Sequence, residues 1–261
     1  MFKSLIVEKN GPVWRVVLNR PEVRNAHDLE MFKELVQAFS EVEDDPDCRC
    51  AILTGAGDMF SAGQDLRFTR SADAQAIDAY GRWNTQARQR IQRNFKPVIA
   101  AVNGPAIGGG CYLATACDLV VAVDTAFFQM PEIRAGNHAG GAFLFTIGRA
   151  RSLELTLLGG RISAQRAEAW GLINRVVSAQ DFEAAVDDYA QALAKLPPLA
   201  LRYTKSACNL LLDSAGFSGH MEAGGPMQRY LGLTPDGREA KRAFVEKRDP
   251  VFTGAYPKVA E

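Results

Sequence analysis

The chain has 261 residues, 47% of them hydrophobic, and its 30 Lys and Arg residues balance its 30 Asp and Glu residues, so the formal net charge is zero. This length suits one large domain or two small ones with a sizeable core, which excludes a disordered or fibrous chain. Because there is neither a net positive charge nor a long basic run, the sequence predicts a small-molecule partner and no nucleic acid.

The apolar segments and the cysteines indicate a cytoplasmic protein without a membrane partner. No segment reaches the ~20 consecutive apolar residues that a membrane span needs, and the apolar stretch near residue 5 is too short for a secretory signal. The five cysteines are odd in number, which is typical of reduced thiols. Cys48 and Cys50 lack the two-residue gap of zinc and redox pairs, so no metal site is predicted.

The first half of the chain alternates short β-rich runs with amphipathic helices. Asp28 is a good N-cap for a helix whose apolar residues recur at helical spacing from 29 to 39, and a second helix is expected over 76–94. The predicted strands cover 12–18, 50–54, 97–102 and 118–123. This order predicts an α/β sheet with crossover helices.

The second half is mainly helical. After about residue 140, only Val176 and Val177 suggest a strand. Helices are expected over 140–158, 163–170, 180–195, 198–213 and 217–231. We therefore expect an α/β core over residues 1–197 and an α-helical region over residues 198–261.

Several cofactor motifs are incomplete or missing. Residues 54–60 begin like a dinucleotide-binding turn, but Phe60 stands in place of the third glycine. The sequence also has no Gly-Lys pair for a phosphate loop and no His-Glu-x-x-His zinc motif. Ser61 lies in a segment that is close to a nucleophile elbow, although Met59 replaces its first glycine, so a serine hydrolase is kept as an alternative.

Two loops remain as candidates for a site, one over 60–66 and one over 103–111. The second contains three successive glycines, Gly108 to Gly110, between a predicted strand and a predicted helix. Glycines let a ligand approach the backbone, and the free N–H groups at a helix start favour a developing oxyanion. Alternatively, the glycines simply allow that helix to pack tightly.

Four ordered segments carry a resemblance to a known family. They read LNRPEVRNA, FSAGQDL, NGPAIGGGCYLATACDLVVA and AFVEKRDPVF, and the match extends from about Phe2 to Gly254. The chain resembles the crotonase family, that is, enoyl-CoA hydratases and isomerases. The resemblance implies an α/β spiral of ββα units with an α-helical C-terminal region that forms trimers, commonly paired into hexamers. It also implies an acyl-CoA substrate and no separate cofactor, since coenzyme A is part of the substrate.

The resemblance also implies an oxyanion hole and a CoA site. In the family the thioester carbonyl accepts two backbone N–H bonds, and the matching positions here are Ala62 and Gly109. Such donors contribute roughly 3 to 4 kcal/mol each to stabilisation of an enolate. The expected substrate- and CoA-binding residues are Arg24, Ala62, Asp65, Leu66, Gly109, Phe244 and Lys247.

The acid–base residues depart from the hydratase pattern. Hydratases of the family use two glutamates, of which Glu132 matches the second, whereas Tyr112 stands where the first is expected. Apolar neighbours of Glu132 should raise its pKa towards a range that suits proton transfer. Tyr112 is either a weak acid–base group or a wall of the acyl pocket. A single carboxylate suffices for a 1,3-proton shift, so an isomerase and a hydratase both remain candidates.

The histidines leave further alternatives. Asn137 and His138 stand where hydratases usually have apolar residues, which suggests a polar or cyclic acyl group and a hydrolase, decarboxylase or C–C lyase as alternatives. His138 is either a second acid–base group or a histidine bonded within the fold. His27 is expected to be structural, and His220 to lie at a surface or subunit contact. Because Tyr112 replaces a glutamate, a non-catalytic acyl-CoA-binding protein is a further alternative.

Overall fold

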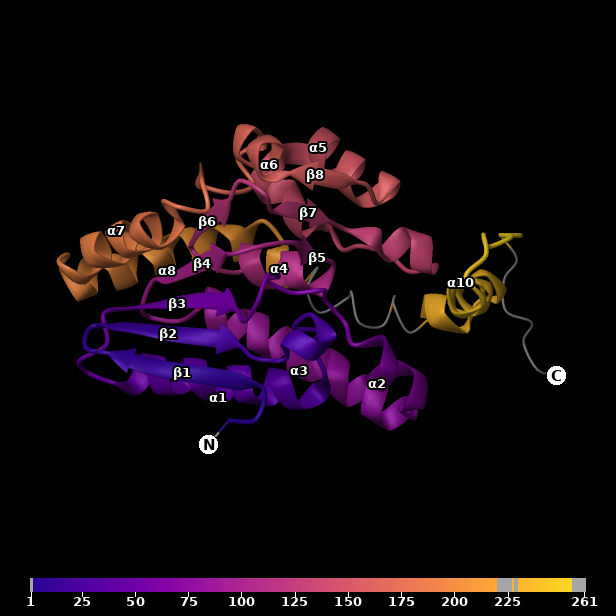
Figure 1. Ribbon diagram of the computed structural model, residues 1–261, viewed down its shortest axis with the longest axis horizontal. Coiled ribbons are helices and arrows are strands. Elements are labelled where there is room, and N and C mark those ends of the chain that lie inside the picture. Colours follow the sequence, from indigo (N-terminus) through magenta and orange to yellow (C-terminus); the bar gives the residue numbers. More distant parts are fainter. Residues whose placement is uncertain (1, 220–226, 228–229, 255–261) are drawn as a thin grey trace.

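The computed structural model describes residues 2–219, 227 and 230–254, and its centre is a six-stranded sheet (Figure 1). The strand order is β1-β2-β3-β4-β6-β9, in which β1 and β2 form an antiparallel hairpin and the remaining neighbours are parallel. The strands are β1 (Leu5–Asn10), β2 (Val13–Leu18), β3 (Cys50–Gly55), β4 (Val98–Val102), β6 (Leu119–Val123) and β9 (Arg175–Val177). The predicted strands are confirmed, whereas β1 was not predicted, because most of its residues are exposed and its second half is polar.

A second, three-stranded sheet lies beside the first. It consists of β5 (Ala106–Ile107), β7 (Phe127–Gln129) and β8 (Arg161–Ser163) in the order β5-β7-β8. Strands of two or three residues are too short for a recognisable alternation of apolar and polar residues. For that reason the expectation of a single strand after residue 140 was wrong: β8 pairs antiparallel with β7.

Two long helices of the first half pack against each other. They are α1 (Leu29–Asp44) and α3 (Ala74–Gln92), and the edge of the Phe32 ring meets the Tyr80 ring, with 5.2 Å between the centroids. As predicted, Asp28 caps α1, since its carboxylate accepts the Met31 N–H at 2.9 Å. Three short helices also lie in the first half of the chain: η1 (Pro21–Val23), α2 (Leu66–Ser71) and α4 (Gly109–Thr115).

The second half is helical, as expected. Its helices are η2 (Pro131–Ala135), η3 (Gly141–Phe143), α5 (Leu144–Leu158), α6 (Ala164–Trp170), α7 (Phe182–Ala194), α8 (Pro198–Ser214) and α10 (Pro235–Glu246). Gly148 has a φ of +73° and kinks α5, so the helix expected over 140–158 is not continuous. Residues 220–226 and 228–229 of the helix expected over 217–231, including His220, lie outside the described residues. Among the described helices, none combines the length and hydrophobicity needed to cross a bilayer.

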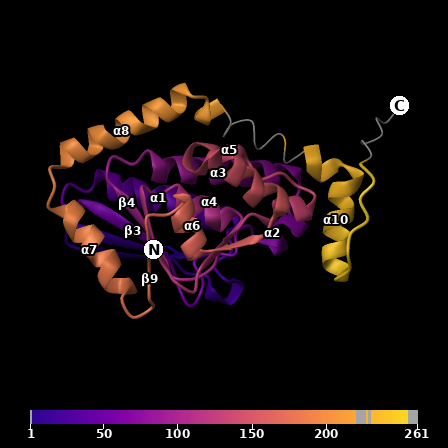
Figure 2. The same cartoon turned by 90° about the horizontal axis from the view of Figure 1, so that it is seen from above.

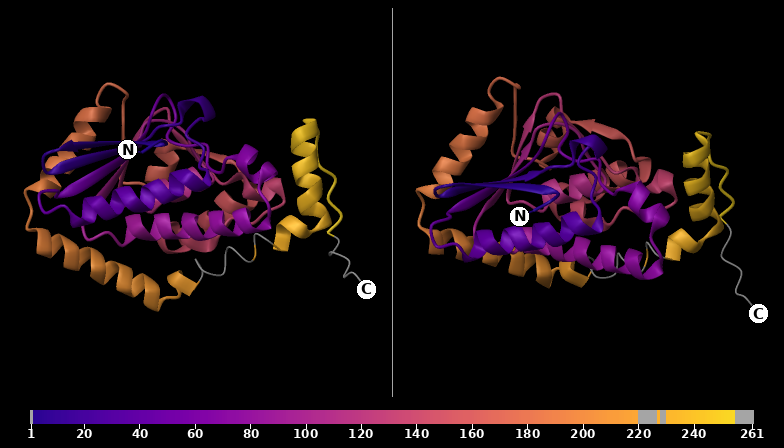
Figure 3. Two further views of the ribbon diagram at one scale, coloured as in Figure 1. Left: turned by 90° about the horizontal axis from the view of Figure 1, so that it is seen from below. Right: turned by 60° about the horizontal axis from the view of Figure 1, so that its bottom comes forward.

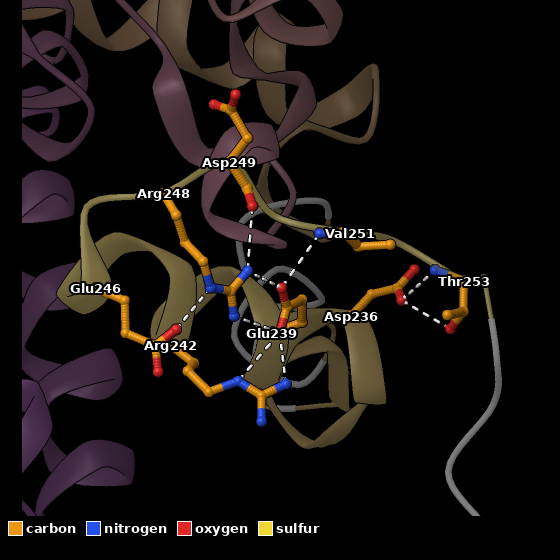
Figure 4. Close-up of polar contacts among 8 residues, drawn as sticks. All are labelled: Asp236, Glu239, Arg242, Glu246, Arg248, Asp249, Val251 and Thr253. Atoms are coloured by element: carbon orange, nitrogen blue, oxygen red, sulfur yellow. Dashed lines mark hydrogen bonds and ion pairs between the residues drawn. The ribbon is translucent and has the colours of Figure 1, made fainter.

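The last two described helices lie at the edges of the molecule. Figures 2 and 3 show α8 along one side of the body and α10 at the end opposite α7. The segment after α10 folds back onto it, because the Glu239 carboxylate accepts bonds from the Arg248 guanidinium (2.5 Å) and the Val251 N–H (3.1 Å) (Figure 4). Asp236 likewise accepts the Thr253 N–H at 2.8 Å. The helix and the segment that follows it therefore form one unit.

Candidate active site

The loops that follow β2, β3 and β4 meet at one edge of the sheet. The His27 N–H donates to the Gly63 carbonyl (2.6 Å), and the Asp65 N–H donates back to the His27 carbonyl (2.9 Å). On the other side of this loop, the Ile107 N–H donates to the Ser61 carbonyl (2.9 Å). The carboxyl ends of parallel strands lie at the same sheet edge, where α/β proteins commonly bind ligands. The two loops predicted from the sequence are thus neighbours in space.

Glycines make this close approach possible. Gly63 has a φ of +85°, and a methyl group on its Cα would lie 2.5 Å from the Ile107 carbonyl oxygen. A methyl group on Gly110 would lie 2.5 Å from the Ser61 carbonyl oxygen. Both distances are too short for a real side chain, so glycine is required at both positions. At Gly110 the structure thus shows the tight helix packing that was the alternative explanation of these glycines, and approach of a ligand to this backbone stays a prediction.

Gly109 is the first residue of α4. Gly108 precedes it as N-cap, with a φ of +53° and no side-chain cap, and the Gly108 N–H donates to the Gln129 carbonyl at 2.8 Å. The first N–H groups of a helix have no partner within the helix and carry its partial positive charge. The Gly109 N–H is therefore placed where the sequence predicts an oxyanion donor.

The Ala62 N–H is different from that of Gly109. It donates to the Arg24 carbonyl oxygen at 2.9 Å, so this predicted donor is already engaged. Arg24 and Asn25 both have left-handed backbone conformations, with φ values of 57° and 53°. The Asn25 amide holds this loop by donating to the carbonyls of Ala56 (2.9 Å) and Met59 (2.8 Å). A ligand oxygen reaches the Ala62 N–H only if the Arg24 carbonyl moves away.

Glu132 lies in the first turn of η2 and directs its carboxyl group towards the Gly108 turn. A methyl group on Gly108 would lie 2.8 Å from Glu132 Oε1, which means that the carboxyl group packs directly on the glycine. Its other oxygen, Oε2, is buried without a hydrogen-bond partner among the described residues. Burial raises the pKa of Glu132 to about 7, as its apolar neighbours predicted. At neutral pH this group can both accept and return a proton.

Tyr112 occupies the position of the missing glutamate and forms a wall. Its ring stacks on Phe143, with 5.1 Å between the centroids and 6° between the planes. Its hydroxyl group donates to the Gly140 carbonyl at 3.1 Å. Burial raises the pKa of this phenol well above its usual value, as does the nearby Glu132 carboxylate, so the hydroxyl group stays protonated. These contacts favour the interpretation of Tyr112 as a pocket wall over that of a base.

His27 has a role that its sequence position did not reveal. Ser61 Oγ lies 2.8 Å from the Asn25 carbonyl and 2.8 Å from His27 Nε2, and it accepts the Gly63 N–H at 3.0 Å. Because a carbonyl only accepts, Ser61 gives its single proton to Asn25, and His27 Nε2–H must then donate to Ser61. Burial lowers the pKa of His27 to about 3, so the ring is neutral and Nδ1 carries no proton.

The bare nitrogen of His27 faces the candidate oxyanion site. Nδ1 is buried without a hydrogen-bond partner among the described residues. A methyl group on Gly109 would lie only 3.3 Å from it. His27 was expected to be structural, and its bond to Ser61 supports that role, but Nδ1 also supplies an acceptor beside Gly109. Only the spatial network reveals this acceptor, since a single histidine beside a helix cap carries no such signal in the sequence.

The predicted CoA-binding residues fall into two groups. Arg24, Asp65 and Leu66 line one cavity of about 380 Å³ next to Ala62. Within it, Asp65 is bonded to the Arg20 guanidinium (2.9 Å) and caps α2, so its carboxylate also has a structural role. Phe244 and Lys247 of the predicted set are not among the residues that line this cavity.

Phe244 and Lys247 lie at the end of α10 and do not line the cavity near Ala62. Phe244 is 63% exposed, and Lys247 ends the helix with a φ of 54°. His138 lies half-buried in the loop between η2 and η3, where its N–H donates to Asn137 Oδ1 at 2.9 Å. The structure thus brings Ala62, Gly109 and Glu132 into one region, whereas Phe244 and Lys247 belong to α10, which packs on the segment after Glu132, with Gly237 beside Gly136.

Comparisons with known proteins identify the family to which the chain is similar. The model of the enoyl-CoA hydratase/isomerase family matches residues 8–255. A probable enoyl-CoA hydratase of Mycobacterium bovis is 36% identical, with 97% of this chain and 98% of the relative covered. A carnitinyl-CoA dehydratase of Salmonella heidelberg is also 36% identical, with coverage of 97% and 100%.

Solved structures show the same fold. An enoyl-CoA hydratase from Mycobacterium avium subsp. paratuberculosis superimposes with a TM-score of 0.87 at 30% identity, covering 97% of this chain and all of that one. An enoyl-CoA hydratase/isomerase from Pseudoalteromonas atlantica gives a TM-score of 0.87 at 28% identity, with coverage of 96% and 100%. The predicted crotonase-like α/β fold is confirmed, and the chain belongs to the enoyl-CoA hydratase/isomerase family, whose members act on acyl-CoA thioesters.

Proposed function

We propose that this protein hydrates or isomerises an enoyl-CoA through a thioester enolate, with Glu132 as its single carboxylate. The observation that carries the proposal is the position of the Glu132 carboxyl group, which packs on the Gly108 turn with one buried oxygen unpaired. A buried carboxyl group without a partner costs stability, and a substrate C–H or water proton would give it a function.

In the proposed reaction the thioester oxygen accepts the Gly109 N–H. For isomerisation, Glu132 takes a proton from C2 of a 3-enoyl thioester, and the electron pair of that C–H bond moves onto the carbonyl oxygen as an enolate. The same group then returns the proton to C4, so that the double bond lies between C2 and C3. For hydration, water adds to C3 of a 2-enoyl thioester, and Glu132 transfers a proton from that water to C2. Neither route uses a cofactor.

The Ala62 N–H joins this site as the second donor when the substrate oxygen displaces the Arg24 carbonyl. The exchange replaces one hydrogen bond by another, so its main cost is the movement of the Arg24–Asn25 loop. Left-handed conformations of residues other than glycine are costly, which makes a rearrangement of this loop easier.

Hydration and isomerisation are each favoured by one observation. The names of two relatives, enoyl-CoA hydratase and carnitinyl-CoA dehydratase, favour addition or loss of water. The protonated Tyr112 leaves Glu132 as the one carboxylate at the turn, which favours a one-base proton shift. The product of the reaction distinguishes the two.

The test follows the Glu132→Gln variant in heavy water by mass spectrometry of enoyl-CoA thioesters. We expect the variant to lose about 10²- to 10⁴-fold in turnover and to keep CoA-thioester binding, because the amide cannot carry the proton. Wild-type turnover should rise with pH as Glu132 ionises around its pKa of about 7. The control is Glu183→Gln at an exposed carboxylate on α7, which should leave turnover unchanged.

The products separate the alternatives. A deuterated double-bond isomer without added water indicates an isomerase, and a hydrated product indicates a hydratase. Release of the free acid would point to a hydrolase instead. Binding without any turnover would indicate an acyl-CoA-binding protein, and turnover of the Gln variant within a few-fold of wild type would show that Glu132 is not the proton carrier.

The proposal includes self-association through α8. None of the residues of this helix is buried, and its exposed apolar side chains are Leu199, Tyr203, Leu210 and Leu211. Apolar faces of this kind are typical of subunit interfaces. A second copy of the chain is the occupant we propose, in a trimer or a pair of trimers.

A further inference from the structure

Arg88 of α3 is a half-buried cation without a counter-charge among the described residues. Its Nε is buried and has no hydrogen-bond partner among the described residues, which also offer its guanidinium no ion pair. Its contact is with the face of the Tyr112 ring, whose centroid lies 5.1 Å from Cζ. An aromatic face stabilises a cation only modestly and leaves the donors of the guanidinium unused. Withdrawal of part of a guanidinium from water without a partner charge costs stability, which a carboxylate would offset.

The neighbouring acidic groups do not supply that pair. The acidic side chains whose charge would act on Arg88 are the phenols of Tyr112 and Tyr80, and burial raises both of their pKa values, which keeps them neutral. Asp118 lies on the wall of the same cavity but is bonded to the Lys205 ammonium at 2.6 Å. The Arg88 charge is felt as far as His27, whose pKa it helps to lower after burial and the charge of Arg20.

Arg88 lines a cavity that can hold a ligand group. The cavity has a volume of about 460 Å³, within the range of small-molecule sites. Its wall combines polar side chains, among them Gln92 and Asn209, with the rings of Tyr112, Phe143 and Phe145. Tyr112 is the link to the reacting end, because it lies three residues after Gly109 on the same short helix.

We propose that Arg88 binds a carboxylate carried by the acyl group of the substrate, so that the protein acts on acyl-CoA thioesters with a second, anionic end. This inference rests on the proposed function, since it assigns the substrate class of the same site. A guanidinium binds a carboxylate through two parallel N–H···O bonds, and both partners become neutralised inside the cavity. The unpaired charge is then a feature that the substrate completes.

The first measurement is binding, because it does not depend on turnover. The probes are saturated acyl-CoA thioesters of increasing length that end either in a carboxylate or in a methyl group. At one or more lengths we expect wild type to bind the carboxylate-ended probe about 10- to 100-fold more tightly than its methyl-ended match. The Arg88→Met variant should lose this preference while keeping its affinity for the methyl-ended probes.

Two further variants control for charge and fold. Arg88→Lys keeps the charge without the planar fork and should retain part of the preference. Arg82→Met removes an exposed arginine of the same helix, which pairs with Asp78, and should retain all of it. Thermal unfolding of each variant shows whether α3 is intact.

Two results would overturn the proposal. In the first, wild type binds the carboxylate-ended and methyl-ended probes with affinities that agree within threefold at every length. In the second, Arg88→Met still prefers the carboxylate-ended probes. Either would indicate that Arg88 is paired by another group, such as a carboxylate of a second copy of the chain. If the binding preference holds but the matching unsaturated thioesters are not turned over, the anion site stands and the proposed reaction fails.

Discussion

At the scale of single residues, two buried atoms that lack a hydrogen-bond partner among the described residues mark the site. Nδ1 of His27 and Oε2 of Glu132 are both buried, and both side chains lie against the Gly108–Gly109 turn. An unsatisfied buried polar atom costs roughly 1 to 3 kcal/mol, so two beside one turn are unexpected in a purely structural loop. A water molecule could donate a hydrogen bond to either atom, whereas a thioester oxygen, which only accepts, could not. The chemistry of the site is therefore expected where the fold leaves its polar atoms unpaired.

A prediction at this scale concerns the acceptor of His27. The His27→Gln substitution can keep the donor to Ser61 through its amide nitrogen and removes the ring Nδ1 beside Gly109. We expect kcat/KM to fall about 3- to 10-fold, the value of one neutral hydrogen bond, with little change in Tm. The His27→Phe variant, which loses both nitrogens, should in addition unfold at a lower temperature. Wild-type kinetics for the Gln variant would show that Nδ1 has no part in the reaction.

At the scale of elements, the start of α4 is the critical feature. The helix is short, and its N-terminus is pinned from two sides, by the Gln129 carbonyl that accepts the Gly108 N–H and by the close packing of Gly63. Short strands β5 and β7 hold these residues in register, with Ile107 opposite Gln129. The start of α4 is thus a rigid frame for the Gly109 N–H group and the Glu132 carboxyl group.

This frame predicts the effect of a methyl group at Gly108. In Gly108→Ala the new Cβ would lie 2.8 Å from Glu132 Oε1 and would also strain a φ of +53°. We expect turnover to fall about 100-fold, because the carboxyl group must move by a large fraction of an ångström. Gly11→Ala is the matched control, since Gly11 has a φ of +58° and no atom within 4 Å of such a methyl group.

Gly11→Ala should lose about 1 kcal/mol of stability from backbone strain, and Gly108→Ala should lose more, because its ψ of −117° lies outside the left-handed helical region. Kinetic assays and chemical denaturation of the pair separate this strain from the displacement of Glu132. Equal activity of Gly108→Ala and Gly11→Ala would show that the position of the carboxyl group at the turn is unimportant.

At the scale of the whole molecule, the topology gathers the site from distant parts of the chain. The parallel order of β2, β3 and β4 places the loops near residues 25, 62 and 108 side by side, and the second sheet adds the segment with Glu132. The helices α8 and α10 lie at the edges of this body (Figure 2). The exposed apolar residues of α8 are those through which we propose that copies of the chain associate.

Substitution of two exposed leucines of α8 tests self-association through this helix. The double substitution Leu210→Glu and Leu211→Glu places two charges on residues that are 67% and 72% exposed. The single-chain fold should tolerate them, whereas an apolar interface should not. We expect light scattering after size exclusion to show a trimer or hexamer for wild type and a smaller species for the variant. Gln191→Glu on the exposed face of α7 is the control, and a monomeric wild-type protein would contradict the proposal.

Much of the fold and the outline of the site could be predicted from the sequence. The central strands β2, β3, β4 and β6 are continuous buried runs, and α1 has both a cap and a regular apolar face, so local pattern sufficed for them. The short strands β5, β7 and β8 exist only through pairing with each other, which no local pattern records.

The sequence by itself determined the features that depend only on which residue type stands at a position. The glycines that permit two loops to touch, the carboxylate at residue 132 and the tyrosine in place of a second glutamate are all of this kind. Only the tertiary structure decided which polar groups are paired: the Ala62 N–H is engaged, whereas Nδ1 of His27 and Nε of Arg88 are not. The physical reason is that a hydrogen bond or ion pair depends on partners far away in the chain, and those partners are set by packing.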